Sequence, residues 1–288
     1  MFSRFRLLTI TAVLVVGALA CYIAALAIIC QSTLHVRRVR PAVSAGSAWR
    51  TVSIRAFDSV RLDGWFVRPE VPTGNCAIVL HGIGDSRQGS AGYASMFLDQ
   101  GYSVLLPDSR GHGSSGGELV TYGLREKYDV LNWARWLREQ NCHALYGLGE
   151  SLGGSVLIQA AALGSDFHAI VAECAFADLH AIAESRMQQI FPLTPWFLVP
   201  NVMTFAKVRY GLDLDQVSPI ESMRRTPTPI LLIHGLRDSR IPYWHSQALA
   251  RANARSVLWL VPTAEHTGAY QAAPTEFRQR VLKWFAGR

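Results

Sequence analysis

The feature that most constrains this chain is a strand-like run that enters a glycine-rich turn and leaves it as a helix. Residues 145–148 are typical of a buried strand and residues 155–162 of a helix, so the turn between them occupies residues 149–153. The turn reads Gly-Glu-Ser-Leu-Gly, and its outer glycines are needed because side chains there would collide with the neighbouring strand or helix. We therefore expect Ser151 to stand clear of a sheet as a nucleophile. The Leu152 amide, at the start of the helix, is placed to donate to an oxyanion.

Strand patterns and helix patterns alternate along the rest of the chain. Apolar or alternating runs predict eight strands, at residues 49–57, 60–67, 76–80, 102–106, 145–148, 168–172, 229–233 and 257–261. Residues 92–100 and 124–139 have the character of helices between strands. This alternation predicts an α/β domain over residues 49–288, with a mostly parallel eight-stranded sheet and helices on both faces.

Function in such a sheet gathers at the carboxyl ends of the strands. Asp238 and His266 follow the last two predicted strands, so the order is Ser151, then the aspartate, then the histidine, as expected of a catalytic triad on this architecture. In this interpretation His266 takes the Ser151 proton and Asp238 orients the imidazole. Plainer interpretations are a surface-loop histidine and a turn-capping carboxylate. Glu265 and Asp215 are weaker alternatives for the acid.

Taken together, these motifs resemble those of an α/β-hydrolase, close to the serine aminopeptidase, monoacylglycerol-lipase and prolyl-oligopeptidase-like branches. The motifs stand in family order: His81-Gly82, Arg110-Gly-His112-Gly-x-Ser115, Gly149-x-Ser151-x-Gly153, His234-Gly-x-x-Asp238 and Glu265-His266. The resemblance covers the chain from Trp49 onward and implies a small cap at about residues 178–218. It also implies that the amide of Ile83 is the second oxyanion donor.

The remaining motif residues are interpreted as structural. His81, His112 and His234 are expected to fix loops rather than to transfer protons. Asp108 and Arg110 are expected to form a hydrogen-bonded pair that shapes their loop. The other histidines are scattered without the close ligand pairs of a zinc site, so neither a metal nor another cofactor is expected.

The five cysteines fall into two groups. Cys21 and Cys30 lie in an apolar segment near the N-terminus, whereas Cys76, Cys142 and Cys174 lie at the ends or starts of predicted strands. An odd set of three in the domain favours buried thiols over a disulfide framework.

The apolar segment at residues 7–30 is uncharged and long enough to cross a hydrocarbon core of about 30 Å. It is therefore predicted to be a transmembrane anchor, between a basic tail at residues 1–6 and a basic juxtamembrane linker at residues 31–48, where residues 41–47 would free the domain from the membrane. The alternative is a cleaved signal peptide with Ala-Leu-Ala at residues 18–20 as its cleavage site. The apolar run continues well past that site, which favours an anchor.

The net positive charge of the chain comes from its first 57 residues. Seven arginines and no acidic residue precede Asp58, and they account for the whole net charge of +7. A basic leader of this kind gives no indication of nucleic-acid binding. The positive-inside rule nearly cancels because arginines flank both ends of the apolar segment, so the side of the membrane that the domain faces is left open.

One segment, at residues 187–210, is rich in proline and large apolar side chains and lies where the cap is expected. It could line an acyl pocket and lean on the bilayer, with Trp196 and Phe197 influencing chain-length preference. It could equally serve only to pack the cap onto the domain. The sequence thus predicts a membrane-anchored serine hydrolase of small-molecule acyl esters. The alternatives are a peptidase or amidase acting on small peptides and a catalytically silent binding module.

Overall fold

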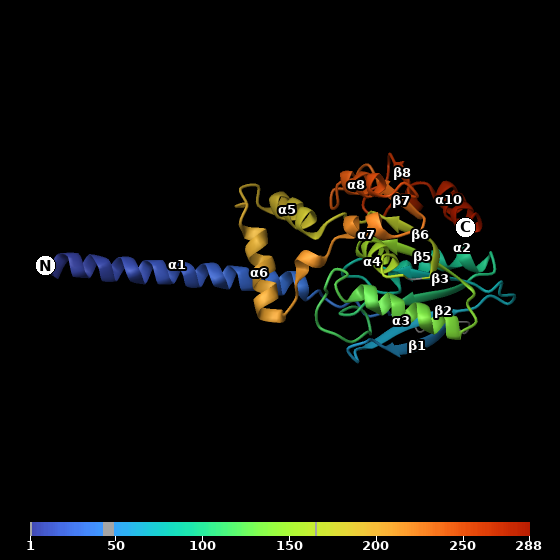
Figure 1. Cartoon of the computed structure of the whole chain (residues 1–288), viewed down its shortest axis with the longest axis horizontal. Helices are drawn as coiled ribbons and strands as arrows, with labels where there is room; N and C mark the ends of the chain where they lie inside the picture. Colours follow the sequence, from blue (N-terminus) through green and yellow to red (C-terminus); the bar gives the residue numbers. More distant parts are fainter. Residues whose placement is uncertain (1, 43–48, 165) are drawn as a thin grey trace.

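Within residues 2–42, 49–164 and 166–288, which the computed structural model describes, eight strands form a single sheet (Figure 1). The strands are β1 (Trp49–Arg55), β2 (Arg61–Val67), β3 (Asn75–Leu80), β4 (Ser103–Pro107), β5 (Ala144–Glu150), β6 (Phe167–Glu173), β7 (Ile230–Gly235) and β8 (Val257–Val261). Their order is β1-β2-β4-β3-β5-β6-β7-β8. β1 and β2 pair antiparallel at one edge of the sheet, and β2 is also antiparallel to β4. The remaining six strands, β3 to β8, are parallel to one another. This topology confirms the predicted mostly parallel sheet.

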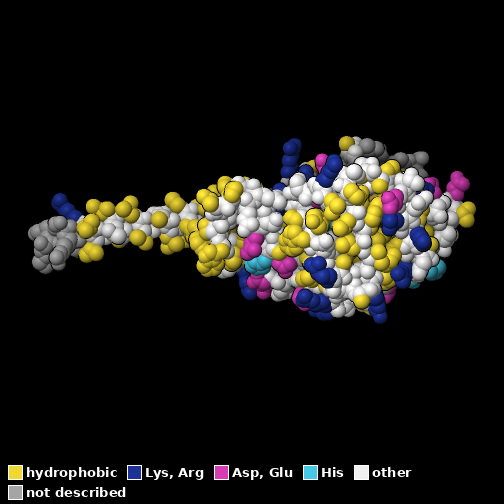
Figure 2. All heavy atoms as spheres, turned by 90° about the horizontal axis from the view of Figure 1, so that it is seen from above, with side chains coloured by type: hydrophobic (Ala, Val, Ile, Leu, Met, Phe, Trp, Pro, Cys, Tyr) yellow, Lys and Arg dark blue, Asp and Glu magenta, His cyan; other side chains and the backbone are white. Residues whose placement is uncertain are grey.

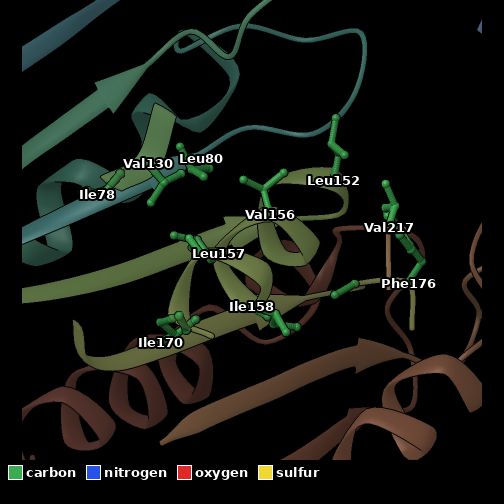
Figure 3. Close-up of a cluster of buried hydrophobic side chains, with 14 of the residues drawn as sticks. Ile78, Leu80, Val130, Leu152, Val156, Leu157, Ile158, Ile170, Phe176 and Val217 are labelled. Carbon is green, nitrogen blue, oxygen red and sulfur yellow. The ribbon is translucent and has the colours of Figure 1, made fainter. Parts of the chain in front are cut away.

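Helices cover both faces of the sheet. One face carries α3 (Glu126–Glu139), α4 (Leu152–Ala161), α7 (Pro219–Arg225) and α8 (Trp244–Ala252), and the other carries η1 (Gly89–Tyr93), α2 (Ala94–Leu98), α9 (Ala269–Ala272) and α10 (Pro274–Ala286). Alternate residues of a strand point to opposite faces. In β3, Ile78 and Leu80 therefore join the cluster around α4, which Figure 3 shows, whereas Ala77 and Val79 join the other cluster. The chain thus has two apolar cores, one on each side of the sheet.

The cap lies between β6 and α7. It consists of α5 (Leu179–Ile190), α6 (Leu198–Tyr210) and η2 (Leu214–Gln216), which fall in the range where a cap was expected. The Asp178 side chain accepts a hydrogen bond from the Ala181 amide and so caps α5. Gly211, with φ of 67°, ends α6 in the left-handed conformation that glycine adopts without strain.

The N-terminal helix is longer than expected and packs against the domain. α1 (Phe2–Leu34) contains the predicted anchor and projects from the body of the molecule, with α6 crossing it near the body (Figure 1). Its last turns are held to the domain by Asn201, which donates to the Tyr22 hydroxyl (2.7 Å), and by Tyr210, which donates to Gln31 (2.7 Å). The helix continues through residues 31–34, where the linker was expected to begin, and Leu34 is buried in the domain core. The part of the predicted linker at residues 43–48 lies outside the described residues.

The prediction of unpaired cysteines in the domain is also wrong. Cys76 in β3 and Cys142, just before β5, form a disulfide across a sequence separation of 66 residues. The sheet brings them together because β3 and β5 are parallel neighbours, with Cys76 opposite Leu145. Cys174 is a buried free thiol, as expected.

Candidate active site

Ser151 occupies a strained turn between β5 and α4. Its φ of 52° is in the region that residues with a side chain rarely adopt, and its amide donates to the Glu173 carbonyl (2.7 Å) at the end of β6. A Cβ added to Gly149 would lie 2.5 Å from the backbone of Gly153, and one added to Gly153 would lie 2.5 Å from the Leu80 carbonyl oxygen. The two glycines are therefore required for the turn to approach both the helix and β3.

The structure brings the three predicted triad side chains together. His266 Nδ1 lies 2.7 Å from Asp238 Oδ2, and His266 Nε2 lies 3.0 Å from Ser151 Oγ. Because a carboxylate oxygen only accepts, Nδ1 carries the proton and Nε2 is left to accept from the serine hydroxyl. This is the tautomer that a general base for Ser151 requires.

Asp238 is held as an anion. Its Oδ1 accepts from the backbone amides of Arg240 (2.8 Å) and Ile241 (2.9 Å). Burial alone would raise the pKa of this carboxyl, but hydrogen bonds from His234 and His266 hold its pKa well below the ordinary value. The group is therefore a carboxylate throughout the neutral range, as needed to stabilise an imidazolium.

The rival acids lie elsewhere. Asp215 is bonded to His180 in the cap (2.7 Å), and Glu265, although adjacent to His266, is exposed. Asp238 is thus the carboxylate that the structure places against the His266 imidazole.

Two loops supply the candidate oxyanion donors. Leu152 is the first residue of α4, so its amide has no acceptor within the helix. Ile83 follows β3 and lines the same cavity as Ser151, and a Cβ added to neighbouring Gly82 would lie 3.4 Å from Ser151 Cβ. The two predicted donors therefore flank the nucleophile from separate strand ends.

Two histidines fix the loop that carries Ile83. His81 Nε2 accepts from the Ser109 amide (3.1 Å), and His112 Nε2 accepts from the Gly84 amide (3.0 Å). Burial lowers the pKa of both rings, that of His112 to about 4, so both are neutral near pH 7. The prediction that these histidines fix loops is confirmed. His234 is also buried, donating from Nε2 to the Ile241 carbonyl (2.8 Å).

The predicted pairing of Asp108 with Arg110 is wrong. Asp108 accepts from the Arg87 amide (2.8 Å) and lies 3.2 Å from the Arg87 guanidinium. Arg110 is almost fully buried and forms ion pairs with Asp129 (2.6 Å) and with Asp58 (2.8 Å) in the β1–β2 turn. Both buried charges are compensated by partners distant in sequence, which local spacing could not reveal.

A pair of carboxylates behind the nucleophile, Glu173 buried and Glu150 half-buried, was not foreseen. The Tyr93 hydroxyl lies 2.9 Å from Glu150 and 3.3 Å from Glu173, and Glu173 also accepts from the Ala269 amide (2.9 Å). Burial raises the pKa of Glu150 to about 7 and that of Glu173 to about 8. Glu150 precedes Ser151, and Glu173 ends β6. A carboxylate inside the turn and another at the end of a strand were therefore the sequence signals from which this pair could have been predicted.

A mostly apolar cavity of ≈ 520 Å³ opens beside Ser151 and His266. Apolar cap side chains line most of it, together with the charged Arg186; the cap residues are Leu179, Ile182, Ala183, Arg186, Met187, Ile190, Val199, Val202, Met203 and Leu214. Two more lining residues, Ile29 and Thr33, come from α1. Trp196 and Phe197 do not line the cavity, so the expectation that they shape acyl preference is wrong. The cap both packs on the domain and lines the cavity, so packing is not the only role of residues 187–210.

Within the described part of the chain, one group of side chains has the spacing to hold a metal ion. The ligand atoms of Cys174, Asp238 and His266 lie within 4.8 Å of one another. Burial holds the pKa of the Cys174 thiol well above its usual range, which disfavours the thiolate that a metal needs. A metal there would also compete with the His266–Asp238 hydrogen bond, so these residues fit the triad better than a metal centre.

Comparison with known proteins places this geometry in a family. The family model of the prolyl oligopeptidase family matches residues 90–288. The uncharacterized protein YqkD of Bacillus subtilis is 32% identical over 230 residues, covering 77% of this chain and 74% of that protein. An esterase from Pyrococcus furiosus superposes with a TM-score of 0.71 at 24% identity, covering 87% of this chain and 100% of the other. An acylaminoacyl peptidase from Pyrococcus horikoshii superposes with a TM-score of 0.64 at 18% identity, covering 83% of this chain and 41% of the other.

Proposed function

The chain belongs to the prolyl oligopeptidase family and has the α/β-hydrolase fold, and from this we propose that it is a serine hydrolase of carboxylic esters, anchored to a membrane by α1. The observation that carries the proposal is the hydrogen-bonded row from Ser151 through His266 to Asp238, at the wall of a mostly apolar cavity. The row supplies an activated nucleophile, and the cavity offers space for an acyl chain.

The proposed reaction proceeds through an acyl-enzyme. As Ser151 Oγ attacks the ester carbonyl carbon, its proton passes to His266 Nε2, and Asp238 stabilises the resulting imidazolium. The amides of Ile83 and Leu152 donate to the oxyanion of the tetrahedral intermediate. The C–O bond to the alcohol then breaks, and His266 gives its proton to the leaving alkoxide. Water, deprotonated by the same imidazole, then attacks the acyl carbonyl carbon. The bond from that carbon to Ser151 Oγ breaks, Oγ takes the proton back from His266 Nε2, and the carboxylic acid is released.

Chain length should govern substrate preference. Each buried methylene contributes about 0.8 kcal/mol, so kcat/KM should rise about fourfold per methylene until the cavity is full. The apolar side chains of α5 and α6 would make these contacts.

A peptidase or amidase is the second candidate, because the family is that of prolyl oligopeptidase and one structural neighbour is an acylaminoacyl peptidase. Esters are favoured because an alcohol leaves more readily than an amine and because apolar side chains dominate the cavity lining. Like the ester proposal, this candidate uses Ser151, so only the substrate separates them.

The test is a hydrolysis screen with the full-length protein in detergent micelles. p-Nitrophenyl esters of graded chain length should be cleaved with kcat/KM rising from acetyl to medium chains, and Ser151→Ala should be inactive on all of them. Aminoacyl p-nitroanilides run in parallel. A flat chain-length profile with faster cleavage of the anilides would establish the peptidase instead.

A further inference from the structure

The loop between α5 and α6 exposes a group of large apolar side chains. This cap rim consists of Ile190, Phe191, Leu193 and Trp196, of which Leu193 is 95% and Trp196 84% exposed. It lies in an uncharged stretch, residues 187–206. Figure 2 shows hydrophobic side chains gathered along the projecting helix and where it meets the body of the molecule. Side chains of this kind exposed together mark a surface that meets a membrane or another apolar partner.

The cap rim lies beside a defined level of α1. Phe197, which follows the rim directly, packs edge-on against Tyr22 with ring centroids 6.3 Å apart, and Asn201 in the next turn donates to the Tyr22 hydroxyl. The other end of α6 lies further along α1, where Tyr210 bonds Gln31. The start of α6 is thus fixed near Tyr22, about 13 Å along the helix axis from Gln31.

The length of α1 places that level inside a bilayer. Every side chain from Leu7 to Cys21 is exposed, and the first fully packed one is Leu26. These 15 unpacked residues rise only roughly 22 Å, whereas a hydrocarbon core needs about 20 residues. A span beginning at Leu7 must therefore reach about Leu26, and a tilted one reaches further. Tyr22 then lies in the membrane, and the cap rim beside it does too.

Part of the rim backbone is hydrogen-bonded within the segment. The Thr194 amide and hydroxyl both donate to the Phe191 carbonyl, and the Leu198 amide donates to the Pro195 carbonyl (3.0 Å). These internal hydrogen bonds lower the cost of bringing the groups that make them into contact with hydrocarbon.

The cavity beside Ser151 continues to the cap rim. Ile190 belongs to the rim and also lines the cavity, and Ile29 of α1 lines the same space. An acyl chain could therefore pass between α1 and the cap from lipid to the nucleophile without crossing water.

We propose that the cap rim is inserted in the leaflet adjoining the domain and that the ester substrate is a lipid that enters the cavity from that leaflet. Lipid acyl chains are the partner that contacts the cap rim. The substrate part of the proposal rests on the esterase function proposed above, whereas insertion of the rim rests only on the membrane anchoring by α1 proposed there.

Insertion is tested without an activity readout. The full-length protein is reconstituted in phosphatidylcholine vesicles with or without brominated acyl chains, and tryptophan fluorescence of the wild type is compared with that of Trp196→Phe. The Trp196 component, obtained as the difference, should be quenched by the brominated lipid. An unquenched component overturns the proposal, as does a dimer in detergent that buries the rim instead.

Entry from the bilayer is tested with a matched pair of exposed cap positions. Leu193→Asp puts a charge on the rim, whereas Val208→Asp changes an 83% exposed residue in the last turn of α6, the end that contacts Gln31. Leu193→Asp should lower kcat/KM on a long-chain monoacylglycerol in vesicles by about tenfold, because a charge is costly at membrane depth. Its rate on p-nitrophenyl butyrate should be unchanged, and Val208→Asp should alter neither rate.

The outcomes separate the two proposals. Equal losses for Leu193→Asp and Val208→Asp, or no loss for either, overturn entry through the rim. A wild-type protein that cleaves no ester refutes the esterase function and entry of an ester with it, while the quenching result still decides insertion of the rim.

Discussion

At the scale of single residues, the geometry around Ser151 divides the work among three side chains in a way that substitutions can separate. Ser151→Ala should abolish both ester hydrolysis and fluorophosphonate labelling without changing the thermal midpoint, because only Oγ is removed. Asp238→Asn should lower kcat on the order of a thousandfold or more, because the amide no longer selects the required tautomer of His266. Exposed Glu265→Gln is the control and should retain full activity. Labelling of the Ser151→Ala protein at the wild-type rate would contradict the assignment.

The pair of carboxylates behind the nucleophile should make stability fall as pH rises. Glu173 has a folded pKa of about 8, above the ordinary value of 4.5, so the native state holds a proton that the unfolded chain has lost between these values. Its contribution is complete below about pH 4.5 and is lost as pH rises through 8. The thermal midpoint should therefore fall from pH 5 to 9, and Glu173→Gln should flatten that dependence. Glu184→Gln, at an exposed position, should leave the slope as in the wild type; equal slopes in all three proteins would refute the assignment.

At the scale of elements, α5 and α6 form the cap wall of the cavity. A half-buried position on α6 lets the length of acyl chain that the cavity accepts be tested. Val202 lines the cavity, so Val202→Phe should fill part of it and lower kcat/KM for the longest p-nitrophenyl esters several-fold while sparing the acetyl ester. Trp196→Ala, at an exposed position that does not line the cavity, should leave the profile on these soluble esters unchanged. A profile displaced by Trp196→Ala but not by Val202→Phe would show that the cavity beside Ser151 is not the acyl site.

The elements themselves were largely predictable because each carries a local signal. The strands have apolar runs. The turn at Ser151 can be identified from its glycines, which the close approach of β3 and α4 requires. The sequence could not show which side chains become partners, because that depends on the order of the strands in the sheet. The Cys76–Cys142 disulfide depends on β3 lying beside β5 across 66 residues, and spacing alone does not show which strands are neighbours.

Buried charges escaped prediction for the same reason. Arg110 draws its partners from the β1–β2 turn and from α3, and Tyr93 joins two carboxylates from β5 and β6. The triad was accessible because its three members each follow a strand, and parallel strands end at one edge. The contribution of α1 to the cavity could not be predicted from the sequence. A helix interpreted as a membrane span gives no sign of which face will pack on the domain.

At the scale of the whole molecule, the disulfide bears on which side of a membrane the domain would face in the anchored arrangement proposed above. Disulfides form and persist in oxidising compartments and are rare in the cytosol. Arginines flank both ends of the apolar helix, so charge alone leaves the orientation open. The Cys76–Cys142 pair, bridging two central strands of the sheet, favours an N-terminus in the cytosol and a catalytic domain on the opposite side.

This orientation predicts the behaviour of fusions and of the cysteines. A C-terminal alkaline phosphatase fusion to the full-length chain in bacterial cells should be active, and a C-terminal green fluorescent protein fusion dark, because the first needs an oxidising compartment and the second does not fluoresce when exported there.

In non-reducing conditions, denatured protein should take up maleimide-polyethylene glycol at Cys21, Cys30 and Cys174 only, with two further additions after reduction. Cys76→Ser should cost about 2–5 kcal/mol of unfolding free energy, because the cross-link closes a long loop of the unfolded chain. A fluorescent green fusion together with five additions before reduction would place the domain in the cytosol and leave the two sulfurs as thiols in the cell.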